Sequence, residues 1–214
     1  MTNRSDSALA LVEKITRRAP QLIDLIAAET ERDFDKALDA LLERAIIGLE
    51  TDSKKFASFD EDTLSSILAL AMSVPGISVS RELHSNGHVD LTVEVVGCSP
   101  SRKRLGEAKI YGGPENHIGG LAQLLTRYST GREGRGFVIA YVKRNGIAQL
   151  MKKIRERMDS DMPIKQVGAT SDHSLKWSFL SRHQHECGEE LAVMHIGCNL
   201  FACGTAAAAQ GGID

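Results

Sequence analysis

Three side chains near the middle of the chain have the types and the spacing for phosphate chemistry. Asp90 lies in the run GHVDL, and Glu107 and Lys109 lie two positions apart in the run GEAKI. Two carboxylates can hold one or two Mg²⁺ ions, or Mn²⁺ in their place, because these cations prefer oxygen ligands. An ammonium beside them can orient or deprotonate a water molecule and stabilise negative charge on a phosphate. These residues therefore predict metal-dependent hydrolysis of a phosphodiester.

The strands predicted around these residues bring them together. Residues 77–83, 89–96 and 104–111 alternate in polarity or are rich in β-branched residues, and Asn86-Gly87 is a typical hairpin turn. On one strand Glu107 and Lys109 share a face, and the residues next to them share the opposite face. Neighbouring strands lie about 4.8 Å apart, so we expect Asp90 to form a carboxylate pair with Glu107.

Helical spacing precedes and follows these three strands. It predicts helices over 60–72, 118–128 and 147–158, and an almost unbroken apolar run at 137–142 predicts a strand buried on both faces. Two further strands are expected within 175–201, around Cys187-Gly188. This order predicts an α/β fold with a mixed central β-sheet flanked by helices.

The first part of the chain predicts an N-terminal helical arm. Apolar residues recur at helical spacing in 9–15, 22–26 and 34–46, with Pro20 as a break and Gly48 as a stop. We expect a helical arm over 1–57, a catalytic core over 58–204 and an Ala- and Gly-rich disordered tail over 205–214. Short isolated helices are marginal in water, so the arm needs a partner, either the rest of the chain or another subunit.

With Asp90 on one predicted strand and Glu107-Ala108-Lys109 on the next, the sequence resembles the PD-(D/E)XK, or restriction-endonuclease-like, nuclease superfamily. The core order of that superfamily is helix, three-stranded meander, helix, strand, and the resemblance covers residues 60–145. It implies a restriction-endonuclease-like core and a Mg²⁺-dependent deoxyribonuclease. Asp90 and Glu107 would be metal ligands, and Lys109 would lie at the nucleophilic water. His88-Val89 precedes Asp90 where the family name has proline.

The resemblance also implies supporting residues on the two flanking helices. Many members add a glutamate from the helix before the strands, and Glu61 is similar in position, as a further metal ligand. Several branches carry a glutamine and then a tyrosine on the helix after the motif. Gln123 and Tyr128 resemble that pair, with a spacing one residue longer than the usual QxxxY. Gln123 is therefore expected at the catalytic site.

The distribution of charge favours a nucleic acid as the partner. The net charge is −2, yet residues 100–157 contain thirteen Lys and Arg against four Glu, whereas residues 1–75 contain nine against fourteen acids. Basic residues on phosphates release counterions, and Arg127, Arg132 and Arg135 around a glycine-rich loop are predicted to contact a backbone. The few aromatic residues provide no ladder for stacking single strands, so we expect double-stranded DNA. The alternative for each basic cluster is a solvated surface.

The predicted function is an endonuclease that hydrolyses duplex DNA in restriction, phage defence or repair. Cutting both strands usually requires two active sites, so we expect a homodimer or higher homo-oligomer, with the N-terminal helices as a candidate interface. The alternative is a non-catalytic nucleic-acid-binding or accessory subunit that retains the nuclease fold.

Two groups of histidines offer further possibilities. His183, His185 and Cys187 form an H-x-H-x-C run that would share one face of a strand, as in a zinc-stabilised adaptor. The alternative is a polar strand that ends at a turn. His84 and His88 flank the Asn86-Gly87 turn, where His88 is a candidate for phosphate contact and the alternative is a turn residue.

The sequence predicts a cytoplasmic protein without membrane contact. No apolar run approaches the roughly 20 residues that span a bilayer, and the N-terminal run MTNRSDSALALVEK lacks the order of a signal peptide. The four cysteines are therefore expected to be reduced, structural thiols.

Overall fold

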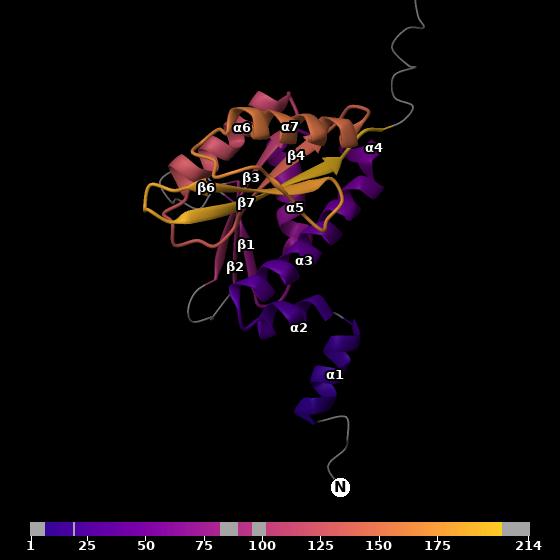
Figure 1. Cartoon of the computed structure of the whole chain (residues 1–214). Coiled ribbons are helices and arrows are strands. Elements are labelled where there is room, and N and C mark those ends of the chain that lie inside the picture. Colours follow the sequence, from indigo (N-terminus) through magenta and orange to yellow (C-terminus); the bar gives the residue numbers. More distant parts are fainter. Residues whose placement is uncertain (1–6, 19, 82–89, 96–101, 203–214) are drawn as a thin grey trace, which may run out of the picture.

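The computed structural model describes residues 7–18, 20–81, 90–95 and 102–202, and these residues form a mixed β-sheet between two layers of helices (Figure 1). The strands are β1 (Ile77–Ser80), β2 (Leu91–Val95), β3 (Lys103–Ile110), β4 (Gly136–Val142), β5 (Ser171–Asp172), β6 (Ser178–Gln184) and β7 (Glu190–Asn199). The helices are α1 (Ala8–Arg18), α2 (Pro20–Ala27), α3 (Glu31–Thr51), α4 (Ser53–Phe56), α5 (Glu61–Met72), α6 (Pro114–Gln123), a π-helical segment (Leu124–Tyr128) and α7 (Ile147–Asp161).

The sheet confirms the predicted mixture of strand directions. Its seven strands lie in the order β1-β2-β3-β4-β7-β6-β5. The first three form the expected antiparallel meander, and β4 and β7 then run parallel to β3. The remaining neighbours, β5, β6 and β7, are antiparallel, so most pairs in the sheet are antiparallel.

Each face of the sheet packs against its own group of helices. Ala108, Ile139 and Ile196 point to the side of α3 and α5, where they join one apolar core. Val138 and Ala140 point to the side of α6 and α7 and join a second core. Since alternate residues on a strand face opposite ways, odd-numbered residues of β3 belong to the α6 side.

Helix α3 is held against the sheet by arginines from the basic part of the chain. Arg104, only 1% exposed, donates to Asp35 (2.7 Å) and Glu31 (2.5 Å), and its guanidinium lies 5.0 Å from the centroid of the Phe34 ring. A buried guanidinium is tolerated only when carboxylates compensate its charge. The opposite charges of residues 1–75 and 100–157 therefore meet in part within the molecule.

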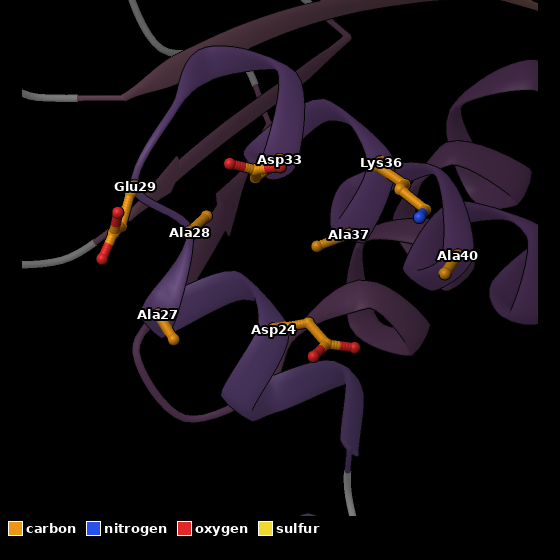
Figure 2. A pocket seen from close by; sticks show the side chains of 8 residues that line it. All are labelled: Asp24, Ala27, Ala28, Glu29, Asp33, Lys36, Ala37 and Ala40. Atoms are coloured by element: carbon orange, nitrogen blue, oxygen red, sulfur yellow. The ribbon is translucent and has the colours of Figure 1, made fainter.

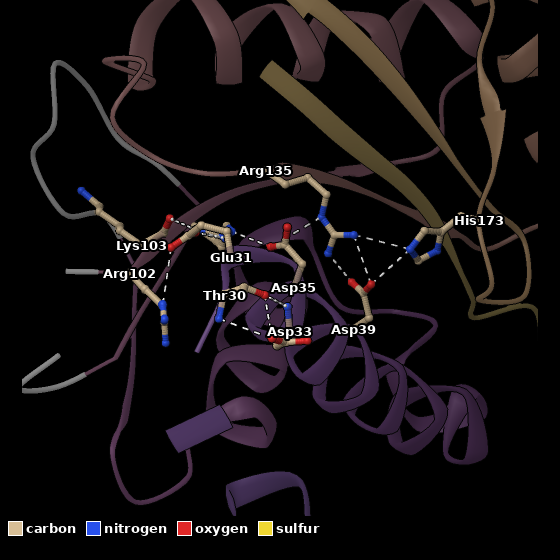
Figure 3. A network of polar contacts seen from close by, with 10 residues as sticks. Thr30, Glu31, Asp33, Asp35, Asp39, Arg102, Lys103, Arg135 and His173 are labelled. Carbon is tan, nitrogen blue, oxygen red and sulfur yellow. Dashed lines mark hydrogen bonds and ion pairs between the residues drawn. The ribbon is translucent and has the colours of Figure 1, made fainter. Parts of the chain in front are cut away.

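A second arginine makes the same kind of contact further along α3. Arg135 points to the carboxylate of Asp39, which His173 also approaches, at 3.1 Å (Figure 3). The prediction that Arg135 contacts a nucleic-acid backbone is wrong, because its side chain is 10% exposed and paired. Arg127 and Arg132 are exposed, and neither forms an ion pair with another described residue.

Several element boundaries differ from those expected. Gly48 does not stop α3, which continues to Thr51, and α6 begins at Pro114 rather than at 118. Proline suits the first turn of a helix because its missing N–H has no partner there. Strand β5 was not expected.

Some predictions cannot be compared with the structure. The Asn86-Gly87 turn, with His84 and His88, and the tail over 205–214 lie outside the described residues. Within the described part of the chain, every helix is too short or too polar to reach across a bilayer.

Gly134 offers a test of the packing around Arg104. A Cβ added at Gly134 would overlap the buried guanidinium of Arg104, which two carboxylates hold in place. We expect Gly134→Ala to lower the free energy of unfolding by about 1–3 kcal/mol, the usual cost of overpacking. Urea denaturation measures this. Gly48→Ala, on the exposed face of α3 with no atom within 4 Å, is the matched control, and it should raise stability by up to about 1 kcal/mol. Equal effects of the two substitutions would contradict the close packing at Gly134.

Candidate functional site

The site begins where β3 continues beyond the end of β2. The pairing of these strands ends at Leu91 and Gly106, so the N–H groups of Ala108 and Ile110 lie past the ladder. Asp90 accepts a hydrogen bond from the Ala108 N–H at 2.9 Å, and Glu61 accepts one from the Ile110 N–H at 2.8 Å. Buried backbone N–H groups need acceptors. Two carboxylates are thereby fixed beside the end of β3.

Glu107 and Lys109 project together from the end of β3 toward α6, on one face of the strand as the sequence predicts. A Cβ added at Gly120 of α6 would lie 3.3 Å from Cγ of Glu107 and 3.0 Å from Cγ of Lys109, so both side chains lie under this glycine. Lys109 Nζ lies 2.7 Å from Glu107 Oε1 and 3.1 Å from Glu61 Oε1. The structure therefore brings Asp90, Glu107, Lys109 and Glu61 together.

The site is closed on the side of Glu107 and open on the side of Glu61. The Glu107 side chain is 1% exposed, that of Lys109 17% and that of Glu61 32%. A ligand from solvent would therefore meet Glu61 and Lys109 first.

The acids of this cluster repel one another. Burial, and then the charge of Asp90, raise the pKa of Glu107 to about 7, although Lys109 opposes this shift. Burial also raises the pKa of Asp90, against the hydrogen bond from Ala108. Burial alone would lower the pKa of Lys109, but its contacts with Glu107 and Glu61 outweigh burial and raise it. Lys109 is thus a cation at neutral pH, and the carboxylates carry more negative charge than it neutralises.

The donor set fits a hard cation with few protein ligands. Glu107 Oε2 is buried and has no hydrogen-bond partner among the described residues. Within the same residues, no three His, Cys, Asp or Glu side chains are grouped so that they could hold a metal ion by themselves. Mg²⁺ often takes only one or two carboxylates and completes its shell with water and phosphate oxygens. Asp90 and Glu107 suit that kind of binding, whereas Glu61 is engaged with Lys109 and Ile110.

Gln123 and Tyr128 lie on the covering helix, and a change in helix type affects their relative position. A continuous α-helix would separate residues five apart by about 140° around its axis. In a π-helix such residues are hydrogen-bonded neighbours, and Ser129 N donates to Leu124 O at 3.0 Å in this way. The π-helical segment thus accommodates the one residue by which the Gln123–Tyr128 spacing exceeds the usual QxxxY. Burial and the charges of Glu107 and Asp90 raise the pKa of Tyr128. Gln123 is partly buried and makes no side-chain hydrogen bond to any described residue.

Two basic residues at the same end of the sheet were not singled out from the sequence. Lys143 and Arg144 follow β4, which is parallel to β3 and ends beside it. Lys143 donates to the Phe59 carbonyl, just before α5, and the guanidinium of Arg144 lies 5.4 Å from the centroid of the Tyr111 ring. The sequence could have indicated these two residues, because residues that follow adjacent parallel strands meet at one edge of the sheet.

The H-x-H-x-C run does not form the predicted ligand face. Strand β6 ends at Gln184, so His185 and Cys187 lie in the following turn. Both ring nitrogens of His183 are hydrogen-bonded inside the protein, to Ile164 O and to Ser181 Oγ. The idea of three ligands on one strand face is therefore wrong.

A separate groove lies between α2 and α3 (Figure 2). Its volume is about 480 Å³. Its lining consists of small and charged side chains, namely Asp24, Ala27, Ala28, Glu29, Asp33, Lys36, Ala37 and Ala40. None of the residues around Lys109 contributes to this groove.

The pKa of Glu107 predicts an unusual pH dependence of stability. An unfolded glutamate has a pKa near 4.5, so between that value and about 7 the folded chain holds a proton that the unfolded chain releases. Stability contributed at this position should therefore fall as the pH rises through this window and then level off. We expect Glu107→Gln to be more stable than the wild type at about pH 8, by about 2 kcal/mol, and similar to it at about pH 4.

Guanidinium unfolding at several pH values measures the difference between the two proteins. Glu156→Gln, at an exposed glutamate of α7, controls for the loss of one carboxylate. A Glu107→Gln variant that gains nothing at high pH would contradict the electrostatic strain described here.

Comparison of the chain with models of known protein families, with characterised proteins and with solved structures gives no match in any of the three. The geometry of these residues is therefore what points to a function.

Proposed function

We propose that this protein is a metal-dependent endonuclease of the PD-(D/E)XK type that hydrolyses phosphodiester bonds of duplex DNA, in restriction, phage defence or repair. One observation carries the proposal: Asp90, just before β2, lies together with Glu107 and Lys109 of the neighbouring β3 where the pairing of the two strands ends. A surface Glu–Lys pair would be exposed, whereas here Glu107 is buried and Lys109 is half-buried beneath α6.

The order of elements supports a restriction-endonuclease-like core. Helix α5 precedes the antiparallel meander β1-β2-β3, and α6 leads to β4, which is parallel to β3. The resemblance in the sequence implies this order of helix, three strands, helix and strand. The proposed catalytic residues lie on β3 and just before β2, at the positions of the motif.

Each residue of the cluster has a chemical role in this proposal. Asp90 and Glu107 would hold Mg²⁺, which when bound supplies an activated water and polarises the phosphate. Lys109 remains protonated, so it orients the water and stabilises developing negative charge rather than accepting a proton. Glu61 holds the ammonium of Lys109 in place.

The basic residues beside the cluster would guide the DNA backbone toward it. Arg144 is exposed at the end of β4, and Arg127 is exposed on the π-helical segment. Gln123 lies on the same covering helix as Gly120, one turn further on, where it can assist in positioning a phosphate.

A nicking assay on supercoiled plasmid with Mg²⁺ tests the catalytic roles. We expect Glu107→Ala and Lys109→Ala each to lower the rate by about 100-fold or more, because each removes a group aimed at the reacting phosphate. Lys152 and Glu156 form an exposed ion pair on α7 at 3.5 Å. Lys152→Ala and Glu156→Ala are therefore matched controls and should cut like the wild type.

The same proteins distinguish an enzyme from an accessory subunit. Electrophoretic mobility shifts should show that Glu107→Ala still binds duplex DNA, because Arg127 and Arg144 are unchanged. If the wild type binds DNA but equals Glu107→Ala in the nicking assay, the chain is a binding protein that retains the fold, and the catalytic assignment fails.

We further propose that the protein is a homodimer that associates through its N-terminal helices. Helix α1 has no buried residue, and its Leu9, Leu11 and Val12 side chains are 68%, 58% and 47% exposed. Figure 1 shows α1 standing away from the sheet. A short helix with an exposed apolar face is marginal in water unless a partner covers it. The basic residues of α1, at Lys14, Arg17 and Arg18, would complement the acidic groove between α2 and α3.

Sedimentation velocity tests this association. We expect the wild type to sediment as a dimer and the double substitution Leu9→Asp with Val12→Asp to sediment as a monomer, since charge on this face opposes its burial. Leu70→Asp, at an exposed leucine of α5, should leave the dimer intact. A monomeric wild type at micromolar concentration would refute this interface without touching the catalytic assignment.

A further inference from the structure

A chain of four buried polar side chains runs between the sheet and helix α6. His183, Ser181 and His117 are each 1% exposed, and His195 is fully buried. His183 Nε2 lies 2.7 Å from Ser181 Oγ, which lies 2.8 Å from His195 Nε2. His195 Nδ1 lies 2.9 Å from His117 Nε2. The proposed catalytic cluster contains none of these residues.

The direction of every hydrogen bond in this chain follows from its first member. His183 Nδ1 lies 2.9 Å from the Ile164 carbonyl, which can only accept, so this nitrogen carries a proton. In a neutral imidazole the other nitrogen is then an acceptor. The single Ser181 hydroxyl hydrogen must therefore point to His183 Nε2. Ser181 Oγ consequently accepts from His195 Nε2–H.

The same logic continues to helix α6. With its proton on Nε2, neutral His195 has a bare Nδ1, which accepts from His117 Nε2–H. His117 Nδ1 is then a bare acceptor, and it has no partner among the described residues. Neutral rings are expected here, since burial lowers the pKa of His117 to about 4 and also lowers those of His183 and His195.

The hydrogen-bonded chain ends at His117, one helical turn before Gly120, which covers the proposed site. His117 and Gly120 are three residues apart on α6 and so lie on one face of it. Gly120 lies over Glu107 and Lys109. His195 is aligned across the sheet with Val138 of β4, which is aligned with Glu107 of β3. The hydrogen-bonded chain thus joins α6 to the row of residues that contains Glu107.

We propose that His183, Ser181, His195 and His117 form a directional hydrogen-bond chain that positions helix α6 over the Glu107–Lys109 pair. Apolar contacts alone allow a helix to slide or rotate on a sheet, because they have no direction. The hydrogen bond between His117 and His195 reaches α6, and the two hydrogen bonds behind it fix which of its atoms donates, so this contact gives α6 a preferred orientation at His117. In this role the four residues are positioning residues, and the effect on catalysis rests on the proposed nuclease function.

Nitrogen-15 NMR of histidine-labelled protein tests the chain directly, whether or not the protein cuts DNA. In the wild type we expect neutral rings, with the proton on Nδ1 of His183 and on Nε2 of His195 and His117. Ser181→Ala removes the link between His183 and His195. It should change the ring-nitrogen shifts of His117, two hydrogen bonds away, toward a mixture of tautomers.

Two further variants distinguish the loss of the hydrogen-bond chain from a general change in packing. Ser178→Ala, on the same strand, breaks hydrogen bonds to His173 and Leu175 instead, and should leave His117 unchanged. Ser181→Cys retains a weak donor and should restore the His117 tautomer if Ser181→Ala folds poorly. Opposite tautomers in the wild type, or an unchanged His117 in folded Ser181→Ala, would overturn the proposal.

The activity of the same variants tests the positioning role. With an active wild type, Ser181→Ala should lower kcat by roughly tenfold, as does the removal of residues that orient a catalytic group through hydrogen bonds. The KM for DNA should stay unchanged. A changed His117 tautomer with unchanged kcat would establish the chain but refute its effect on the site. An inactive wild type would refute the nuclease proposal, and the NMR result would still decide the chain.

Discussion

The arrangement of the site depends on one constraint, namely that β3 is longer than the ladder that β2 offers it. Beyond Gly106, the N–H groups of Ala108 and Ile110 have no partner on β2 among the residues that the structure describes. An unpaired buried N–H costs about as much as a lost hydrogen bond, so acceptors must be supplied from elsewhere. Asp90 and Glu61 supply them. The same hydrogen bonds that complete the strand hold two carboxylates beside Glu107 and Lys109.

The acidic side chains gathered around Glu107 lower the stability of the folded protein. Glu107 is buried beside other acids, and one of its oxygens has no partner among the described residues. By contrast, the buried charge of Arg104 is compensated by Asp35 and Glu31. Perturbed carboxylates that gather in one place are typical of functional sites. The contrast within one molecule is therefore more informative than the raised pKa of Glu107 alone.

Local sequence was sufficient to predict the described strands other than β5, and the pair of side chains on β3. The alternation around Glu107 and Lys109 fixes their common face, and the meander follows from strand length and turns. Contacts between segments that are distant in the sequence were harder to predict. The basic residues Arg104 and Arg135 suggested a nucleic-acid surface, but α3 covers them with acids from 69 and 96 positions away. Charge along a sequence does not show which charges will be neutralised on folding.

Periodicity predicts a helix over 118–128, but it could not show that the helix changes type at Leu124. The sequence places Gln123 and Tyr128 five apart, which an α-helix would turn to different faces, yet the π-helical segment absorbs the extra residue. A wider turn is less stable than an α-turn and persists where other contacts hold the helix on both sides of it. The buried His117–His195 hydrogen bond holds α6 before this segment, and the buried Tyr128 side chain packs into the apolar core at its end. Helix, sheet and cluster are thus coupled through the side chains that face one another beneath α6.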